Sequence, residues 1–160
     1  MVFEYSQFSE WYHRKVISGV LKGERTIIVK LWDAHICGIA ILKRTNHEKK
    51  ICTLRILTGY KCHGLGTELI RQSIDELGTE KPMITVSSNL ISEFTPILRT
   101  FEFDLVGVYR NCYVSSIDEY AFNNYLPEKQ SIHGITDGTL GLMMQSPLNT
   151  HSAARSFICR

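Results

Sequence analysis

The segment from Leu54 to Leu77 constrains the fold more than any other part of the chain. Up to Leu57 it belongs to a short apolar run of the kind that forms strands, whereas after Gly64 the apolar residues recur every three or four positions. The hydrophobic pattern thus changes from the period of a strand to that of a helix across a short glycine-containing loop. We therefore expect a strand that leads directly into a helix.

Before this segment, the sequence predicts one helix and three strands. Apolar residues recur at helical spacing from Phe8 to Leu21, with Ser6 available as N-cap and Gly23 just past the end. Three apolar runs with short connections then predict an antiparallel meander. Its expected strands are residues 26–32, 36–42 and 51–57.

After the central helix, which Gly78 closes, strand and helix patterns continue to alternate. After Asn89, the residues Phe94, Ile97, Leu98 and Phe101 predict a second helix, and Thr95 and Pro96 mark an alternative, later start for its regular part. The chain therefore reads as a single α/β domain over residues 1–160, with a mixed sheet flanked by helices. The other expected segments are strands at 82–87 and 105–114, a long loop at 115–138, a last strand at 139–145 and a loose terminus at 147–160.

Composition excludes several classes of protein. With 160 residues, of which 44% are hydrophobic and 21% charged, the chain can bury a core without disulfides or structural metals. No apolar run reaches the length of a membrane span, and no basic segment precedes an apolar stretch at the start. Five cysteines without a C-x-x-C pattern predict no metal site and favour a reduced, cytoplasmic compartment.

The net charge of +2 is distributed unevenly. Residues 1–50 carry nine Lys and Arg against five Asp and Glu, whereas the last sixty residues are net acidic. A basic cluster flanks a predicted turn and has two interpretations, a solvated hairpin end and a patch for a polyanion such as nucleic acid. The cluster consists of Lys43, Arg44, Lys49 and Lys50.

The loop between the central strand and helix is a candidate anion site. A strand-to-helix loop presents unpaired backbone N–H groups and the positive end of a helix dipole to one point, where a pyrophosphate fits. Gly64 and Gly66 let the backbone approach such a ligand without a Cβ, although a plain tight turn accounts for the same glycines. Thr67 and Leu69 rule out the Walker A loop and the dinucleotide fingerprint, respectively.

The stretch Lys61-Cys62-His63-Gly64-Leu65-Gly66 resembles the acetyl-CoA loop of the GNAT N-acetyltransferase superfamily, whose pattern is Arg/Gln-x-x-Gly-x-Gly/Ala. Lys61 stands in place of the Arg or Gln. The order of elements is also that of a GNAT domain, with antiparallel strands before the loop and helix, strand, helix and strand after it. The resemblance covers about residues 8–146, and the family's first short strand is not evident.

The resemblance implies an acetyl-CoA-dependent N-acetyltransferase with a mostly antiparallel central sheet. The preceding strand would pair with the pantetheine arm, and a backbone N–H near Ile56 would polarise the thioester carbonyl. The acceptor would be the primary amine of a small molecule, a peptide or an aminoacyl-tRNA, attacked directly in a ternary complex. A homodimer is implied as well. The implied coenzyme-binding residues are Leu54, Ile56, Lys61, Cys62, His63, Gly64, Leu65, Gly66, Thr67 and Asn89.

The sequence departs from the family at the catalytic acid. Many members carry Tyr-x-x-x-Gly-Phe, whose tyrosine protonates the departing thiolate, but here Leu98 and Glu102 replace the tyrosine and glycine. Tyr109 and Tyr113 are candidate substitutes, although an aromatic side chain in a strand more often serves packing. The rival hypotheses are a GNAT-like CoA-binding or sensor module without catalysis and an interaction domain without a CoA site.

Overall fold

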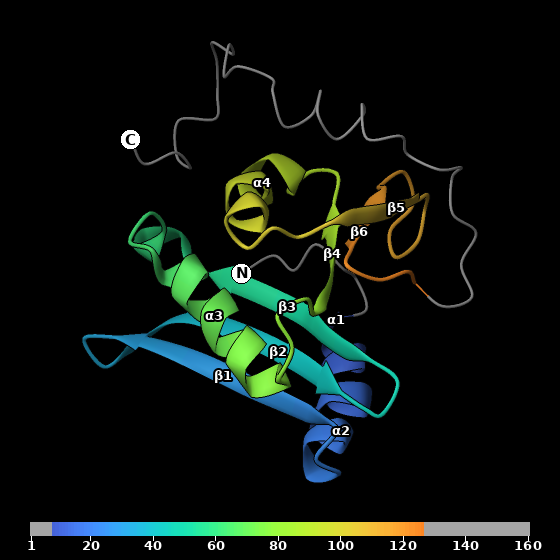
Figure 1. The fold of residues 1–160 in the computed structure, drawn as a ribbon. Coiled ribbons are helices and arrows are strands. Elements are labelled where there is room, and N and C mark those ends of the chain that lie inside the picture. The colour runs from blue at the N-terminus through green and yellow to red at the C-terminus, as the bar shows by residue number, and fades with distance from the viewer. Residues whose placement is uncertain (1–7, 127–160) are drawn as a thin grey trace. The chain divides into compact units, whose positions relative to one another are not determined.

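The computed structural model describes residues 8–126 (Figure 1). They form a mixed, mostly antiparallel sheet of six strands with helices, in the strand order β1-β2-β3-β4-β6-β5. The chain divides into two compact units at the boundary between Ile84 and Thr85. No helix in the described part of the chain is long and apolar enough to cross a membrane.

The predicted N-terminal helix is confirmed as one helical stretch in three parts. These are α1 (Phe8–Trp11), η1 (Tyr12–Ile17) and α2 (Ser18–Leu21). The spacing of apolar residues did not predict that η1 is π-helical, a rare form that occurs frequently at functional sites. Gly23 follows with a φ of 71°, which ends the helix where the sequence predicted. The predicted N-cap Ser6 lies outside the described residues.

The antiparallel meander is also confirmed, as β1 (Arg25–Trp32), β2 (His35–Arg44) and β3 (Lys49–Ile56). Asp33 and Ala34 both have positive φ, at 47° and 63°. A two-residue turn of this kind matches the right-handed twist of the flanking strands, so it fixes the register of β1 on β2.

Helix α3 (Leu65–Leu77) begins and ends where the sequence predicted, between Gly64 and Gly78. It packs against the meander and contacts β1, β2 and β3 (Figure 1). Because apolar residues of the helix and of the strands are buried together there, this packing forms the core of the first unit. The buried apolar residues of α3 are Leu65, Leu69, Ile70 and Leu77.

Strand β4 (Met83–Ser87) returns parallel to β3 after the α3 crossover, as a β-α-β connection requires. The paired register is short, since it consists of Lys50 with Met83 and Ile51 with Ile84. In the strand register, the residues of β3 after Ile51 thus pair only with β2 and not with β4.

In the second unit, α4 (Ile91–Thr100) is the helix predicted after Asn89. The alternative start at Thr95 and Pro96 is wrong, because Pro96 lies inside the helix. The missing N–H of Pro96 removes one backbone bond, and the Thr95 hydroxyl donates to the Ile91 carbonyl at 2.7 Å. Burial of Leu98 on the apolar face of the helix outweighs this local signal.

The strand expected at 105–114 is shorter, and the predicted loop contains a further strand. β5 (Leu105–Tyr109) pairs antiparallel with β6 (Glu119–Phe122). Asn111 and Ser116, which lie between these two strands, both have left-handed backbone conformations. The Asn111 side chain accepts a hydrogen bond from the Ser116 N–H at 2.6 Å. A four-residue strand is too short to show a period in its hydrophobic residues, so the sequence did not predict β6. The strand predicted at 139–145 and the terminus at 147–160 lie outside the described residues.

The close approach of β2 to β3 at Gly38 gives a test of the meander. A Cβ on Gly38 would lie 2.6 Å from Ile56 Cδ1 and 3.1 Å from the Arg55 carbonyl oxygen. We expect Gly38→Ala to lower the free energy of unfolding by about 1–3 kcal/mol through overpacking, measured by urea denaturation. Gly59→Ala is the control, since nothing lies within 4 Å of a Cβ there. Equal denaturation midpoints for the two variants would contradict the register.

Candidate functional site

The loop from β3 to α3 is held in place at both ends. After β3, the Leu57 N–H donates to the Cys37 carbonyl at 2.8 Å, and a short 3-10 turn, η2 (Thr58–Tyr60), follows. At the other end, the Glu68 N–H donates to the Gly64 carbonyl at 3.1 Å, which begins the bonding of α3. The residues between are therefore fixed by a strand on one side and a helix on the other.

Between these anchors, a row of backbone N–H groups lies at the start of α3. Within the described part of the chain, the five N–H groups from His63 to Thr67 have no carbonyl partner. They lie at the N-terminus of a helix of 13 residues, whose dipole places partial positive charge at the same point. Such a set of donors binds an anion without any cationic side chain.

Gly64 lies within this row of N–H groups, which we call the anion cradle (residues 63–67). It adopts the left-handed conformation, with φ 75° and ψ −2°. A left-handed residue followed by the right-handed helical residue Leu65 turns successive N–H groups toward one side, an arrangement that favours anions. Cys62 is also left-handed, with φ 69°, and is disulfide-bonded. It therefore offers a ligand its backbone rather than a free thiol. Cys37, Cys52 and Cys112 are not disulfide-bonded.

The His63 ring is oriented by its own loop. Its Nδ1 lies 2.8 Å from the Lys61 carbonyl and 3.3 Å from the Tyr60 carbonyl. Because carbonyl oxygens only accept, Nδ1 carries the proton, and Nε2 is left to accept or, when protonated, to donate. The ring also lies 5.3 Å from the ring of Trp32 at the end of β1. A phosphate contact by His63 stays a prediction.

One carboxylate lies close to the proposed anion cradle. Glu68 is in the first turn of α3, where its charge would compete with a bound anion for the helix dipole. Lys30 on β1 pairs with it, with Nζ and Oε2 2.6 Å apart. The pair offsets the repulsion that Glu68 would otherwise exert on an anion.

The end of β3 presents backbone donors next to the loop. The Leu57 N–H points to β2, where it donates to Cys37, and successive residues of a strand point their N–H groups to opposite sides. The N–H groups of Ile56 and Leu54 therefore point away from β2, and the register of β3 with β4 has already ended at Ile51. The structure thus brings Leu54, Ile56 and the segment 61–67 together in the first unit.

The sequence matches no protein-family model and no curated protein at a significant level. Solved structures, in contrast, share the fold. The ribosomal-protein-S18-alanine N-acetyltransferase from Escherichia coli aligns with a TM-score of 0.54 and 17% identity over 67% of this chain and 74% of its own. A GNAT family acetyltransferase from Elizabethkingia anophelis, with acetyl-CoA bound, aligns with a TM-score of 0.55 and 12% identity over 68% of this chain and 80% of its own.

A third structure, an acetyltransferase from Bacillus subtilis in complex with CoA, aligns with a TM-score of 0.54 and 13% identity over 69% of this chain and 82% of its own. The fold is that of the GNAT acetyltransferases. The mixed, mostly antiparallel sheet expected from the GNAT resemblance is therefore confirmed. Among the solved structures compared, the share of the other chain that is covered runs from 61% to 82%.

The remaining predicted site residues belong to the second unit. Asn89 lies in the turn after β4, where its Oδ1 accepts from the Ser88 hydroxyl at 3.4 Å. Tyr113 is 48% exposed, whereas Tyr109 is 1% exposed and its hydroxyl oxygen accepts the Leu126 N–H at 3.1 Å. Leu98, in the place of the GNAT tyrosine, is fully buried. The catalytic assignments of Tyr109 and Tyr113 stay predictions.

Two features of the second unit were not found from the sequence. The Ser87 hydroxyl at the end of β4 is buried without a hydrogen-bond partner in the described part of the chain. A buried hydroxyl costs about 1–3 kcal/mol unless a ligand or water satisfies it, so Ser87 offers a bonding position. Burial raises the pKa of the Tyr120 phenol above its ordinary value, and the Asp118 carboxylate raises it further. No pattern of residue types marks either position.

The described residues contain no group of three or more His, Cys, Asp or Glu side chains arranged to hold a metal ion.

The Tyr109 hydroxyl gives a prediction for stability. We expect Tyr109→Phe to lower the free energy of unfolding by about 1–3 kcal/mol, because the buried Leu126 N–H loses its acceptor. Tyr125→Phe serves as the control, since Tyr125 is 62% exposed. Chemical denaturation of the two variants measures the difference. An equally stable Tyr109→Phe variant would show that the hydroxyl has no structural role.

Proposed function

We propose that the protein binds acetyl-CoA at residues 61–67 and transfers its acetyl group to a primary amine. The observation that carries this proposal is the row of unoccupied N–H groups from His63 to Thr67 at the start of α3. The GNAT resemblance implies that the coenzyme's pyrophosphate would bind at this loop. Acetyl-CoA or CoA is bound in two of the structures with the same fold, which supports the choice of ligand.

The residues at the end of β3 would orient the rest of the coenzyme. The N–H groups of Leu54 and Ile56 point away from β2, so an extended pantetheine arm can pair with them as an added strand does. A donor at Ile56 would then face the thioester oxygen and stabilise the negative charge that develops there when an amine attacks the carbonyl carbon. The carbon–sulfur bond breaks, the CoA thiolate leaves, and the amine gives up one proton.

A module that binds CoA without catalysis is the second candidate. Leu98 occupies the position of the usual GNAT tyrosine and is fully buried, so it has neither a proton to give nor access to a thiolate. The Tyr109 hydroxyl, a candidate replacement, is already engaged with the Leu126 N–H. The nature of the acceptor, a homodimer and a cytoplasmic location stay predictions of the sequence.

Calorimetric titration with acetyl-CoA tests the site. We expect saturable binding by the wild type and a loss of at least tenfold in affinity for Gly66→Glu, because a carboxylate then lies among the N–H donors. Gln72→Glu is the matched control, as it adds the same charge to an exposed position of α3. A folded wild type that does not bind acetyl-CoA would overturn the proposal. Equal losses for the two variants would show that net charge, rather than the loop, governs binding.

Release of free CoA thiol in the presence of amines separates the two candidates. For an acetyltransferase we expect thiol release that depends on both acetyl-CoA and an amine, tested with small-molecule amines, peptides with free N-termini and aminoacyl-tRNA. Gly66→Glu provides the background rate. Binding of acetyl-CoA without thiol release from any of the three acceptor classes would favour the non-catalytic module.

A further inference from the structure

A second candidate site lies at the opposite end of the meander from the loop. Here the helical stretch and the strands β1 and β2 line a cavity of about 460 Å³ that is open to solvent on one side, a size typical of sites for small ligands. Five cationic side chains line it against one carboxylate. The charged lining residues are Arg14, Lys15, Lys22, Arg25, Lys43 and Glu24.

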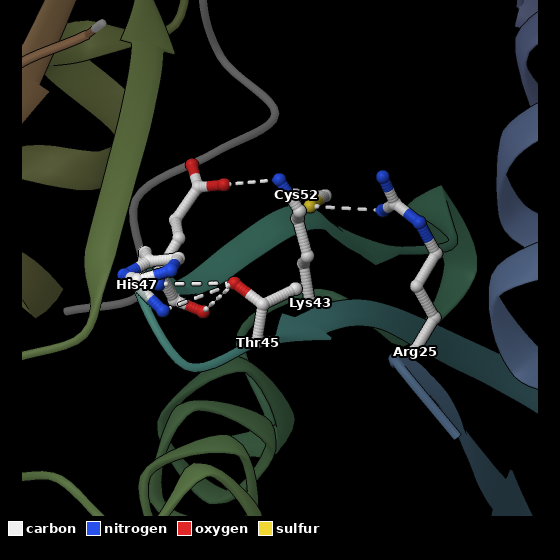
Figure 2. A network of polar contacts seen from close by, with 6 residues as sticks. Arg25, Lys43, Thr45, His47 and Cys52 are labelled. Carbon is white, nitrogen blue, oxygen red and sulfur yellow. Dashed lines mark hydrogen bonds and ion pairs between the residues drawn. The ribbon is translucent and has the colours of Figure 1, made fainter. Parts of the chain in front are cut away.

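Arg25 is held in place by neutral groups (Figure 2). Its Nη1 donates to the Cys52 Sγ at 3.3 Å, and its guanidinium carbon lies 5.6 Å from the centre of the Trp11 ring. Gly19 makes room for it, because a Cβ at that position would lie 2.6 Å from Arg25 Cδ. These contacts orient the guanidinium without neutralising it, so a full positive charge faces the cavity.

The strand register places further cations beside Arg25. Arg25 on β1 is the direct partner of Lys43 on β2, and Lys43 is the partner of Lys50 on β3. Like charges directly opposite one another on neighbouring strands destabilise a sheet. Lys43 forms an ion pair with Glu48. Within residues 8–126, Arg25 and Lys50 form no ion pair with an acidic side chain.

The helical stretch contributes cations from the other side. Arg14 and Lys15 belong to the π-helical η1, and Lys22 follows α2. In the described part of the chain, Arg14 forms an exposed ion pair with Glu10 at 3.3 Å, whereas Lys15 and Lys22 form none. An exposed ion pair is weak, so a stronger anion can displace Glu10 from Arg14.

The cations that line this cavity are grouped at one end of the meander. Arg44 and Lys49, two other cations of the meander, donate to the carbonyls of Glu76 and Gly78 at 3.1 Å and 2.9 Å, respectively. They are thereby committed to the C-terminal end of α3, where cations complement the helix dipole. A polynucleotide requires a basic surface that follows its backbone, whereas a bounded cluster fits a compact ligand with several negative charges.

We propose that this cavity binds a compact polyphosphate of nucleotide size, in which the Arg25 guanidinium engages one phosphate and Lys15 and Lys22 engage the others. Arginine forms paired hydrogen bonds with phosphate, and lysine neutralises it as a point charge. The site is separate from the loop. Arg25 is the first residue of β1 and Trp32, which contacts His63, is the last, so about 23 Å of strand lies between them.

The test is calorimetric titration with inorganic tripolyphosphate, ATP and a single-stranded RNA oligonucleotide at fixed low salt. We expect tripolyphosphate and ATP to bind with similar affinity if phosphates alone are recognised, and ATP to bind more tightly if the nucleoside adds contacts. Either result supports the proposal. The absence of binding by both, or binding of RNA alone, overturns it.

Variants locate the binding. We expect Arg25→Gln and the double variant Lys15→Gln/Lys22→Gln each to weaken tripolyphosphate binding about tenfold, since each removes charge from the cavity. The double variant alters exposed side chains and so tests the site even if Arg25→Gln does not fold. Arg110→Gln, an exposed arginine of the second unit, is the charge-matched control. Equal effects of all three would show that net charge alone draws the anion.

Two glycine variants complete the design. Gly19→Ala keeps every charge but displaces Arg25, so we expect this variant to bind tripolyphosphate more weakly than the wild type. Gly59→Ala should bind tripolyphosphate as tightly as the wild type. Gly66→Glu should lose acetyl-CoA and retain tripolyphosphate. If Gly66→Glu loses both ligands, tripolyphosphate binds at the loop and the second site does not exist. If acetyl-CoA fails to bind the wild type but tripolyphosphate binds as described, the second site stands without the first.

Discussion

The left-handed backbone at Gly64 is the constraint on which the rest of the first unit depends. It allows the chain to leave β3 and begin α3 within a few residues, and the helix then packs across the meander and buries its apolar face. A side chain at Gly64 would strain this conformation. The same turn leaves the N–H groups of His63 to Thr67 without carbonyl partners among residues 8–126. One backbone conformation therefore supports both the core and the proposed coenzyme loop.

Much of the first unit could be predicted because its signals are local. The change of hydrophobic period around Gly64 and the glycine at 78 gave the bounds of α3, and three apolar runs gave the meander. The second unit was harder because its elements are short and its signals conflict. Pro96 favoured a later helix start than burial of Leu98 permits, and β6 has only four residues. The Ser87 hydroxyl and the cavity around Arg25 depend on the tertiary structure, which no spacing along the chain reveals.

The two proposed sites of the first unit attract anions by different physical means. At the loop, the donors are neutral peptide groups whose dipoles add up at the start of α3. At the cavity, the attraction comes from full charges on Arg25 and its lysine neighbours. Full charges act over a longer range but are screened by salt, whereas oriented peptide groups act only on a ligand that fits against them. The loop is therefore the more selective site, and the cavity is the more sensitive to ionic strength.

The arrangement around Arg25 is hard to explain by stability alone. Its partner across the strands is Lys43, a pairing that weakens the sheet, and Gly19 lowers helix propensity where alanine would raise it. A small neutral residue at position 25 would remove the like-charge pairing and the Arg25 atoms that lie closest to a Cβ on Gly19. What they provide is a guanidinium held in one position by Trp11 and Cys52 and directed at a cavity lined with lysines. A bound ligand with several phosphates would neutralise these cations and so remove their mutual repulsion. Ligand binding therefore explains an arrangement that stability alone does not.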